Sequence, residues 1–148
     1  MKAAPSIKVR NAQRRVRLKV GPLQDFSERA LRLCLKPGGK GGLTALPLVN
    51  VLLVSDRRIA ALHKKFMTLT GSTDVITFQH GEIFVSVDTA KRNGRRFQTS
   101  TENEIRLYIV HGLLHLLGFD DRTAAQARIM ESAQTHVLSE AVREGTSV

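Results

Sequence analysis

Residues 107–121 read LYIVHGLLHLLGFDD, and this stretch is the most informative part of the chain for its fold. From 107 to 119, every position except the two histidines, His111 and His115, is apolar, tyrosine or glycine. A helix that is apolar on all sides is normally buried, so we expect this segment to be a central helix. Two histidines four residues apart on a helix lie on the same side, about one turn (roughly 6 Å) apart along the axis.

Gly118 and Asp121 complete the pattern that the two histidines begin. Glycine accepts the left-handed backbone conformation that often ends a helix, and the following turn can bring Asp121 back toward the histidines. Two imidazoles and one carboxylate make a three-ligand site with an open position, which is typical of a catalytic zinc. The alternative is a pair of core histidines bonded to backbone or to buried carboxylates. We predict that His111, His115 and Asp121 bind one zinc ion or another divalent transition metal.

The residue after the first histidine is Gly112. Zinc proteases of the H-E-x-x-H type carry a glutamate at that position, where it acts as the general base. The glycine therefore argues against a peptidase, which is one alternative for a metal-dependent hydrolase.

Strand and helix patterns alternate along the rest of the chain, without repeats or low-complexity tracts. Residues 47–54 are strongly apolar and β-branched, which predicts a central strand. The other expected elements are strands at 6–10, 74–78 and 82–87, helices at 25–36, from Ser55 or Asp56 to about Phe66, and from Asp88 to about Gly94, and a loop at 37–42. This order predicts a small α/β (or α+β) domain with a single sheet.

Capping patterns mark the start of the last two helices. Thr101 and Glu104 form a capping-box pattern that opens the metal helix, and Thr123 and Gln126 repeat it for a final helix. The residues expected to point inward from the final helix are Met130, Ala133 and Val137.

Length and composition indicate one domain over residues 1–148, with an ordinary core and a basic N-terminal region. The chain has 148 residues, of which 42% are hydrophobic. Cys34 is the only cysteine, which excludes an internal disulfide, and its apolar surroundings predict a packed side chain. No apolar run has the length of a membrane span and no signal peptide is recognisable, so we expect a soluble, cytoplasmic protein.

The charge predicts contact with a polyanion. The net charge is +10, and residues 1–20 contain seven basic residues and no acidic one. Basic surfaces bind nucleic acid by counterion release, although a merely solvated basic face is the alternative. Aromatic residues make up only 5% and tryptophan is absent, so we expect phosphate contacts rather than extensive base stacking. The candidates for RNA binding are Arg14, Arg15, Arg17, Lys19, Lys64 and Lys65.

Two stretches of the chain resemble the YbeY family of bacterial endoribonucleases and rRNA maturation factors. The hallmark of that family is H-G-x-L-H-L-x-G-[YF]-D-H, and residues 111–121 read HGLLHLLGFDD. Residues 73–78 (TDVITF), followed by 81–83 (GEI), resemble a second family motif, which usually ends in G-D-[IL]. The order and spacing of the two stretches also fit, and the resemblance extends over about 48–137.

The resemblance implies a metal-dependent, single-strand-specific endoribonuclease that acts in rRNA maturation and ribosome quality control. The implied cofactor is zinc, and the implied partners are single-stranded RNA, rRNA and the small ribosomal subunit. The family usually has histidine as its third ligand where this chain has Asp121, which is a competent zinc ligand. Many relatives carry an arginine implicated in catalysis at the position of Met67. Methionine cannot hold a phosphate, so Lys64, Lys65 or Arg122 is expected to take that role, or catalysis is weakened.

Proton transfer would need a further group near the metal. Asp120 and Glu82 are the first candidates, with Asp74 and His80 behind them. Asp120 has an alternative role, which is to orient a ligand or to cap the turn. Because of Met67, a ribosome-associated RNA-binding protein with a structural metal stays open as an alternative function.

Overall fold

A four-stranded mixed sheet with helices on both faces forms the framework. The structure is a computed structural model that describes residues 4–35, 42–67 (for Met67 the backbone alone) and 73–146. In chain order its elements are β1 (Ser6–Asn11), α1 (Val20–Leu35), the short 3₁₀ helix η1 (Gly42–Ala45), β2 (Leu48–Val54), α2 (Asp56–Met67), β3 (Val75–Phe78), β4 (Glu82–Ser86), α3 (Val87–Phe97), α4 (Thr101–Leu117) and α5 (Ala124–Thr146). The strand order is β1-β2-β4-β3, in which only β3 runs antiparallel to its neighbour. The prediction of a small α/β domain with one sheet is confirmed.

The alternation of side chains along the strands divides the core into two parts. Successive residues of a strand point to opposite faces of the sheet. Val51 and Leu53 of β2 point toward the larger core with α1, α4 and α5, whereas Val54 packs with Ile59 of α2 on the other face. The sheet is therefore apolar on both faces. This is typical of parallel sheets, in which a central strand such as β2 is covered on both sides.

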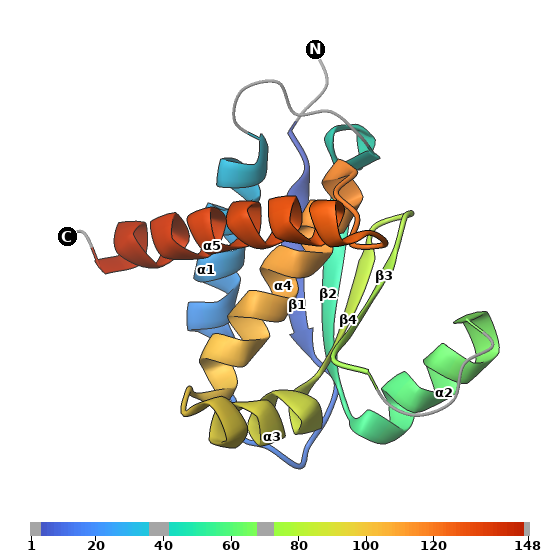
Figure 1. Ribbon diagram of the computed structural model, residues 1–148. Helices are drawn as coiled ribbons and strands as arrows, with labels where there is room; N and C mark the ends of the chain where they lie inside the picture. Colours follow the sequence, from blue (N-terminus) through green and yellow to red (C-terminus); the bar gives the residue numbers. More distant parts are fainter. Residues whose placement is uncertain (1–3, 36–41, 68–72, 147–148) are drawn as a thin grey trace.

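Helix α4 is the central helix that the sequence predicts. It lies against the sheet, and α5 crosses over α4 and α1 on the outer side (Figure 1). Its buried residues are Glu104, Ile105, Tyr108, Ile109, Val110, Gly112, Leu113, Leu114 and Leu116. Burial on nearly all sides explains why residues 107–117 of this helix are apolar apart from Tyr108 and the two histidines.

Most of the predicted elements are present, with small shifts at their ends. Helix α1 begins at Val20 rather than near residue 25, since Pro22 falls in its first turn, where proline is tolerated. Val87 belongs to α3 rather than to the preceding strand. Of the loop predicted at 37–42, positions 37–41 lie outside the described residues, and Gly42 opens η1. Cys34 is buried as predicted, and burial raises the pKa of its thiol to about 12.

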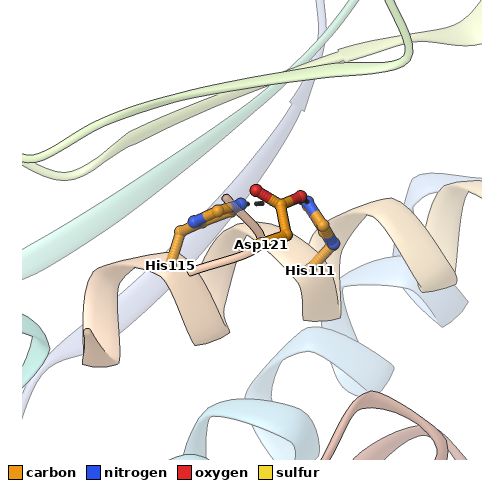
Figure 2. Close-up of side chains that lie close together, drawn as sticks. All are labelled: His111, His115 and Asp121. Atoms are coloured by element: carbon orange, nitrogen blue, oxygen red, sulfur yellow. Dashed lines mark hydrogen bonds and ion pairs between the residues drawn. The ribbon is translucent and has the colours of Figure 1, made fainter. Parts of the chain in front are cut away.

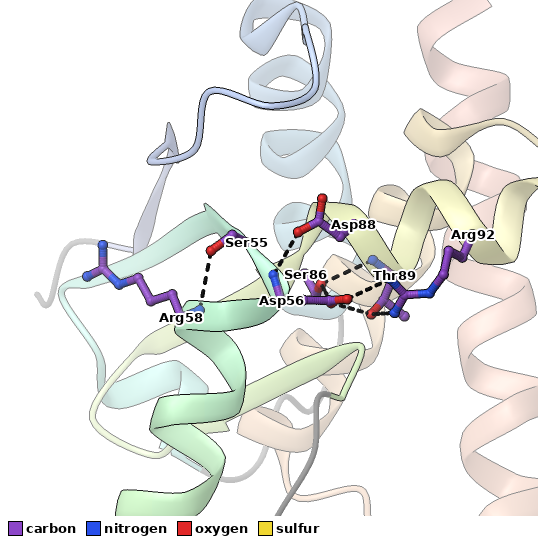
Figure 3. A network of polar contacts seen from close by, with 7 residues as sticks. All are labelled: Ser55, Asp56, Arg58, Ser86, Asp88, Thr89 and Arg92. Carbon is purple, nitrogen blue, oxygen red and sulfur yellow. Dashed lines mark hydrogen bonds and ion pairs between the residues drawn. The ribbon is translucent and has the colours of Figure 1, made fainter.

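Two of the predicted helix caps are wrong. Ser86 caps α3 in place of Asp88, because the Asp88 carboxylate accepts the backbone N–H of Asp56 instead (Figure 3). Ser100 caps α4 in place of Thr101, since its hydroxyl accepts the N–H of Asn103. In both cases a serine one or two positions earlier in the sequence provides the cap, so the helix begins earlier than the pattern suggests.

The other two cap predictions are confirmed. The hydroxyl of Ser55 accepts the N–H of Arg58 at the start of α2. Thr123 and Gln126 exchange hydrogen bonds between side chain and backbone at the start of α5, which is a complete capping box. In α5, Met130 and Val137 are buried and Ala133 packs against the core, as expected.

Among the described residues, no helix has both the length and the apolar character that crossing a membrane requires.

Candidate metal centre

The end of α4 places the predicted metal ligands together. His111 and His115 lie in its last two turns, on the same side of the helix (Figure 2). Gly118 then ends the helix with a φ of 109°, and its N–H donates to the carbonyl of His115. This left-handed position favours glycine and turns the chain so that Asp121 returns toward the histidines.

The three potential ligand atoms form a tight group. The Nε2 atoms of His111 and His115 are 3.0 Å apart, and Oδ2 of Asp121 is 3.8 Å from Nε2 of His111. The three residues each offer one ligand atom, all within 4.8 Å of one another. The His111 side chain is 26% exposed and that of Asp121 is 49% exposed, so the group is open on one side.

Hydrogen bonds to the other ring nitrogens assign the tautomers. Nδ1 of His111 lies 3.0 Å from Oε1 of Gln134 on α5, and Nδ1 of His115 lies 3.1 Å from the carbonyl oxygen of Phe119. Both oxygens are acceptors, so each Nδ1 donates its hydrogen and each Nε2 of a neutral imidazole keeps a lone pair. Two lone pairs that face each other across 3.0 Å repel, and a shared cation removes that repulsion. The donor set therefore fits a metal ion.

The protonation state of His115 suits a ligand. Burial, followed by the neighbouring His111, lowers the pKa of His115, while Asp121 acts in the opposite direction. The net lowering favours the neutral imidazole, which is the form that binds metals.

A cleft lies beside the histidines, between α4 and the edge strand β3. Its volume is about 190 Å³. It is lined by Val75, Ile76, Thr77, Gln79, His111 and His115. A substrate that reaches the open side of the group would enter here, along the free edge of β3.

Gly112 allows α4 to approach the sheet closely. A Cβ atom at this position would lie 2.7 Å from Cγ2 and 2.8 Å from Cδ1 of the fully buried Ile83. A larger residue there would force the Ile83 side chain, the helix or β4 to shift. The glutamate of a zinc protease is thus excluded by packing as well as by sequence.

Of the two first candidates for proton transfer, the structure brings only Asp120 to the group. Asp120 accepts the N–H of Asp121 and pairs with Arg122, with 3.0 Å between Oδ2 and Nε. These contacts match its alternative role of holding the turn. Glu82 points to the other face of the sheet, where its Oε1 lies 2.6 Å from Nε2 of His80.

Asp74, one of the weaker candidates, is also engaged elsewhere. Its side chain accepts the N–H of Val75 at the start of β3.

The basic candidates for RNA binding are exposed, in two separate places. Arg17 and Lys19, in the loop between β1 and α1, line a pocket with Glu102 and Arg106 of the first turns of α4. Arg106 precedes His111 by five residues and His115 by nine, or about 7 Å and about 13 Å along the helix, so this loop lies toward the start of α4 and the histidines toward its end. Lys64 and Lys65 lie in the last turn of α2, on the other face of the sheet. Their role in RNA binding stays a prediction.

Gln134 contacts the candidate site, and the sequence analysis missed it. It lies 23 positions after His111, and its only signal in the sequence is that it shares a helix face with Met130 and Val137. A polar residue on the inward face of a helix generally needs a partner, and here that partner is a predicted metal ligand.

Comparisons with known proteins place the chain in a family. Residues 8–142 match the family model described as Endoribonuclease YbeY. An endoribonuclease YbeY of Bacteroides fragilis is 33% identical over 98 residues, which cover 62% of this chain and 70% of the relative. That of Chloroherpeton thalassium is 28% identical over 123 residues, which cover 78% of this chain and 87% of the relative.

A solved structure agrees with this assignment. The solution structure of the protein TM1509 from Thermotoga maritima superposes with a TM-score of 0.67 at 26% identity. The match covers 95% of this chain and 92% of that protein. The matched family model extends over most of the chain and includes the His111, His115 and Asp121 group, so the chain belongs to the YbeY endoribonuclease family.

Proposed function

We propose that this protein is a metal-dependent endoribonuclease that cleaves single-stranded RNA. Membership of the endoribonuclease family supports the reaction type. The observation that carries the proposal is the group of His111, His115 and Asp121, in which the two Nε2 atoms lie 3.0 Å apart beside an open cleft. By extension from the family, we assign the chain to rRNA maturation and ribosome quality control, with the small ribosomal subunit as its partner.

The residues of the site would have the following roles. His111, His115 and Asp121 would hold zinc or another divalent transition metal, which supplies positive charge against the charge that develops on phosphate and lowers the pKa of water. Gln134 and the Phe119 carbonyl hold the imidazoles in the tautomer that exposes Nε2. The cleft along β3 would receive the sugar-phosphate backbone. Both a water molecule and the 2′-hydroxyl of RNA are suitable nucleophiles.

Asp120 is best placed as a positioning residue. By accepting the N–H of Asp121 and pairing with Arg122, it holds the turn that presents the third ligand. Arg122 itself is 84% exposed beside that turn. Of Lys64, Lys65 and Arg122, it is therefore our first choice to contact a phosphate in place of the arginine that relatives carry at Met67.

A cleavage assay tests the proposed function against its two alternatives. We expect wild-type protein to cut single-stranded RNA but not duplex RNA or casein, and to lose this activity with a chelator or with His111→Ala. Casein cleavage would favour a peptidase. RNA binding without cleavage at any metal supplied would favour an RNA-binding protein with a structural metal, and would contradict the proposal.

The substitute for the missing arginine is tested on the same RNA. If Arg122 has taken the role, Arg122→Ala lowers single-turnover cleavage roughly 30-fold or more, which is the loss expected for one transition-state contact worth 2–4 kcal/mol. Met67→Arg then changes little. A large gain with Met67→Arg and no loss with Arg122→Ala would show instead that the role is missing from this chain.

A further inference from the structure

Three of the six phenylalanines gather at one place on the sheet, on the face that also carries α2. The ring of Phe78 lies 5.4 Å from that of Phe66, at the end of α2, and 5.8 Å from that of Phe84 (centroid distances), both edge to face. The His80 ring stacks on Phe78 at 5.7 Å, with 20° between the planes. We call Phe66, Phe78 and His80, together with Lys65, the aromatic patch.

The outer members of the aromatic patch are open to solvent. Phe66 is 55% exposed and the His80 side chain is 67% exposed, while Phe78 between them is half-buried. A single exposed aromatic ring is ordinary. Here, however, the exposed rings of Phe66 and His80 both pack against Phe78. The three rings therefore form one continuous surface.

Positive charge lies beside the aromatic patch at the end of α2. Nζ of Lys65 lies 5.3 Å from the centroid of Phe66, and Lys64 beside it is also exposed. The strand register aligns Lys8, Asn50, Glu82 and Phe78 in one row across this face, and Lys8 is exposed. Glu82 is the acidic member of the row, and its carboxylate is engaged by the His80 imidazole. Rings with lysines around them are the composition of a surface that stacks the bases of a single strand.

Among the described residues, the edge strand β3 lies between the aromatic patch and the metal cleft. Thr77 and Gln79 line the cleft, and Phe78 lies between them in the sequence with its ring on the opposite face. β3 is an edge strand, and no other strand in the described part of the chain pairs with its outer side. A chain that leaves the cleft over this edge meets the aromatic patch directly.

We propose that the aromatic patch stacks bases of a single-stranded RNA that runs from the metal cleft across the edge of β3. This inference rests on the proposed function, and it adds a base-stacking subsite to the phosphate contacts expected from the sequence. The partner would be recognised by its exposed bases, so this subsite would favour single strands over duplexes, whose bases are stacked on one another.

The first test compares two RNA ligands under chelating conditions, where no cleavage occurs. One is a single-stranded oligonucleotide, and the other is an abasic oligomer with the same number of phosphates. We expect Phe66→Ala to weaken binding of the first roughly tenfold and to leave binding of the second unchanged. Phe97→Ala is a matched control, since Phe97 is 58% exposed and has Arg96 5.3 Å from its ring centroid, but it lies at the end of α3.

The second test uses the absence of tryptophan from the chain. Phe66→Trp introduces a single fluorescent reporter, and RNA should quench it whereas the abasic oligomer should not. Phe97→Trp should respond to neither ligand. This reporter needs no loss of function, so it stays informative if Phe66→Ala alters the local packing.

The outcomes separate the subsite from the proposed function. If wild-type protein cleaves RNA and binds it, but Phe66→Ala binds both ligands as wild type does and Phe66→Trp is not quenched, the aromatic patch is not a stacking subsite and the proposed function stands. Equal losses on both ligands would assign a backbone contact to this place and would also overturn base stacking. If wild-type protein neither binds nor cleaves RNA, the proposed function fails and the subsite fails with it.

Discussion

Asp121 is the most exposed and the least constrained of the three proposed ligands. Its side chain is 49% exposed, and its Oδ2 is 3.8 Å from Nε2 of His111. It follows the helix end at Gly118, so its position depends on a turn rather than on the rigid helix that carries the histidines. The affinity of the site for metal should therefore respond to substitution here without loss of the fold.

We predict that Asp121→Ala lowers metal affinity, whereas Asp121→His retains or improves it. Carboxylate and imidazole both reach zinc at about 2.0–2.2 Å, and the related motif has histidine at this position. Competition with a chromophoric chelator measures the affinities, with circular dichroism as the control for folding. If Asp121→Ala binds metal as tightly as wild type, the third ligand lies elsewhere.

Gly112 is a second position where a single residue matters, because it allows α4 to pack closely against Ile83 of the sheet. We predict that Gly112→Ala lowers the free energy of unfolding by about 1–3 kcal/mol, because the new methyl group overlaps the buried Ile83 side chain. Combination with Ile83→Val, which removes Cδ1, should recover part of the loss. Denaturant unfolding of the single and double variants measures both effects. Additive losses would show that the two side chains do not compete for the same space.

At the scale of elements, a polar network joins the start of α2 to the start of α3. The Asp56 carboxylate accepts hydrogen bonds from Ser86, Thr89 and Arg92, and its backbone N–H donates to Asp88 (Figure 3). Burial alone would raise the pKa of Asp56, but the hydrogen bonds from Arg92, Ser86 and Thr89 outweigh burial and lower it. The network lies at the carboxyl ends of β2 and β4. It therefore joins the two helices, α2 and α3, that follow these strands.

We predict that Asp56→Asn destabilises the protein by about 1–3 kcal/mol at neutral pH, since the bonds lose a charged acceptor. The folded-state pKa of Asp56 lies below its ordinary value of 3.8, so its ionisation stabilises the folded state above that value, and this contribution disappears as the pH falls through the folded-state pKa. The gap between wild type and Asp56→Asn should therefore narrow in acid. Unfolding measured from pH 7 down to pH 3 checks this, and a constant gap would contradict it.

At the scale of the whole molecule, the positive charge is divided among several separate groups of basic residues. The chain carries +10, with one group of bases in the loop before α1 and another at the end of α2. The first group adjoins the start of α4, whereas the proposed metal ligands lie at the end of that helix. A long RNA could contact both groups, whereas a short one held at the cleft could reach only the nearer bases.

We predict that replacing Lys64 and Lys65 weakens binding of both short and long single-stranded RNA, while replacing Arg14 and Arg15 weakens binding of the long RNA only. Each lost phosphate contact should reduce the slope of log affinity against log salt by about 0.7. Binding isotherms over a salt series, with wild type measured alongside, give these slopes. A flat salt dependence for wild type would mean that the basic groups are only solvated surface.

Local patterns in the sequence determined the helix that carries the histidines, its end at Gly118, the capping box of α5 and the central strand β2. These features depend on the periodicity of the backbone and on hydrogen bonds between residues a few positions apart, so neighbouring residues are enough to specify them. The caps predicted at Asp88 and Thr101 are wrong because a nearby serine can cap the same helix. Which of the two residues does so depends on the contacts around them.

The contacts between side chains that are far apart in sequence could be seen only in the tertiary structure. It turned Glu82 to the face away from the histidines, brought Gln134 to His111 from another helix, and set Gly112 against Ile83. It also gathered Phe66 and Phe78 from a helix and a strand into one surface, although the low aromatic content argued against such a surface. These contacts join segments that are far apart in sequence. Their geometry is therefore set by how the helices pack on the sheet, which no local pattern records.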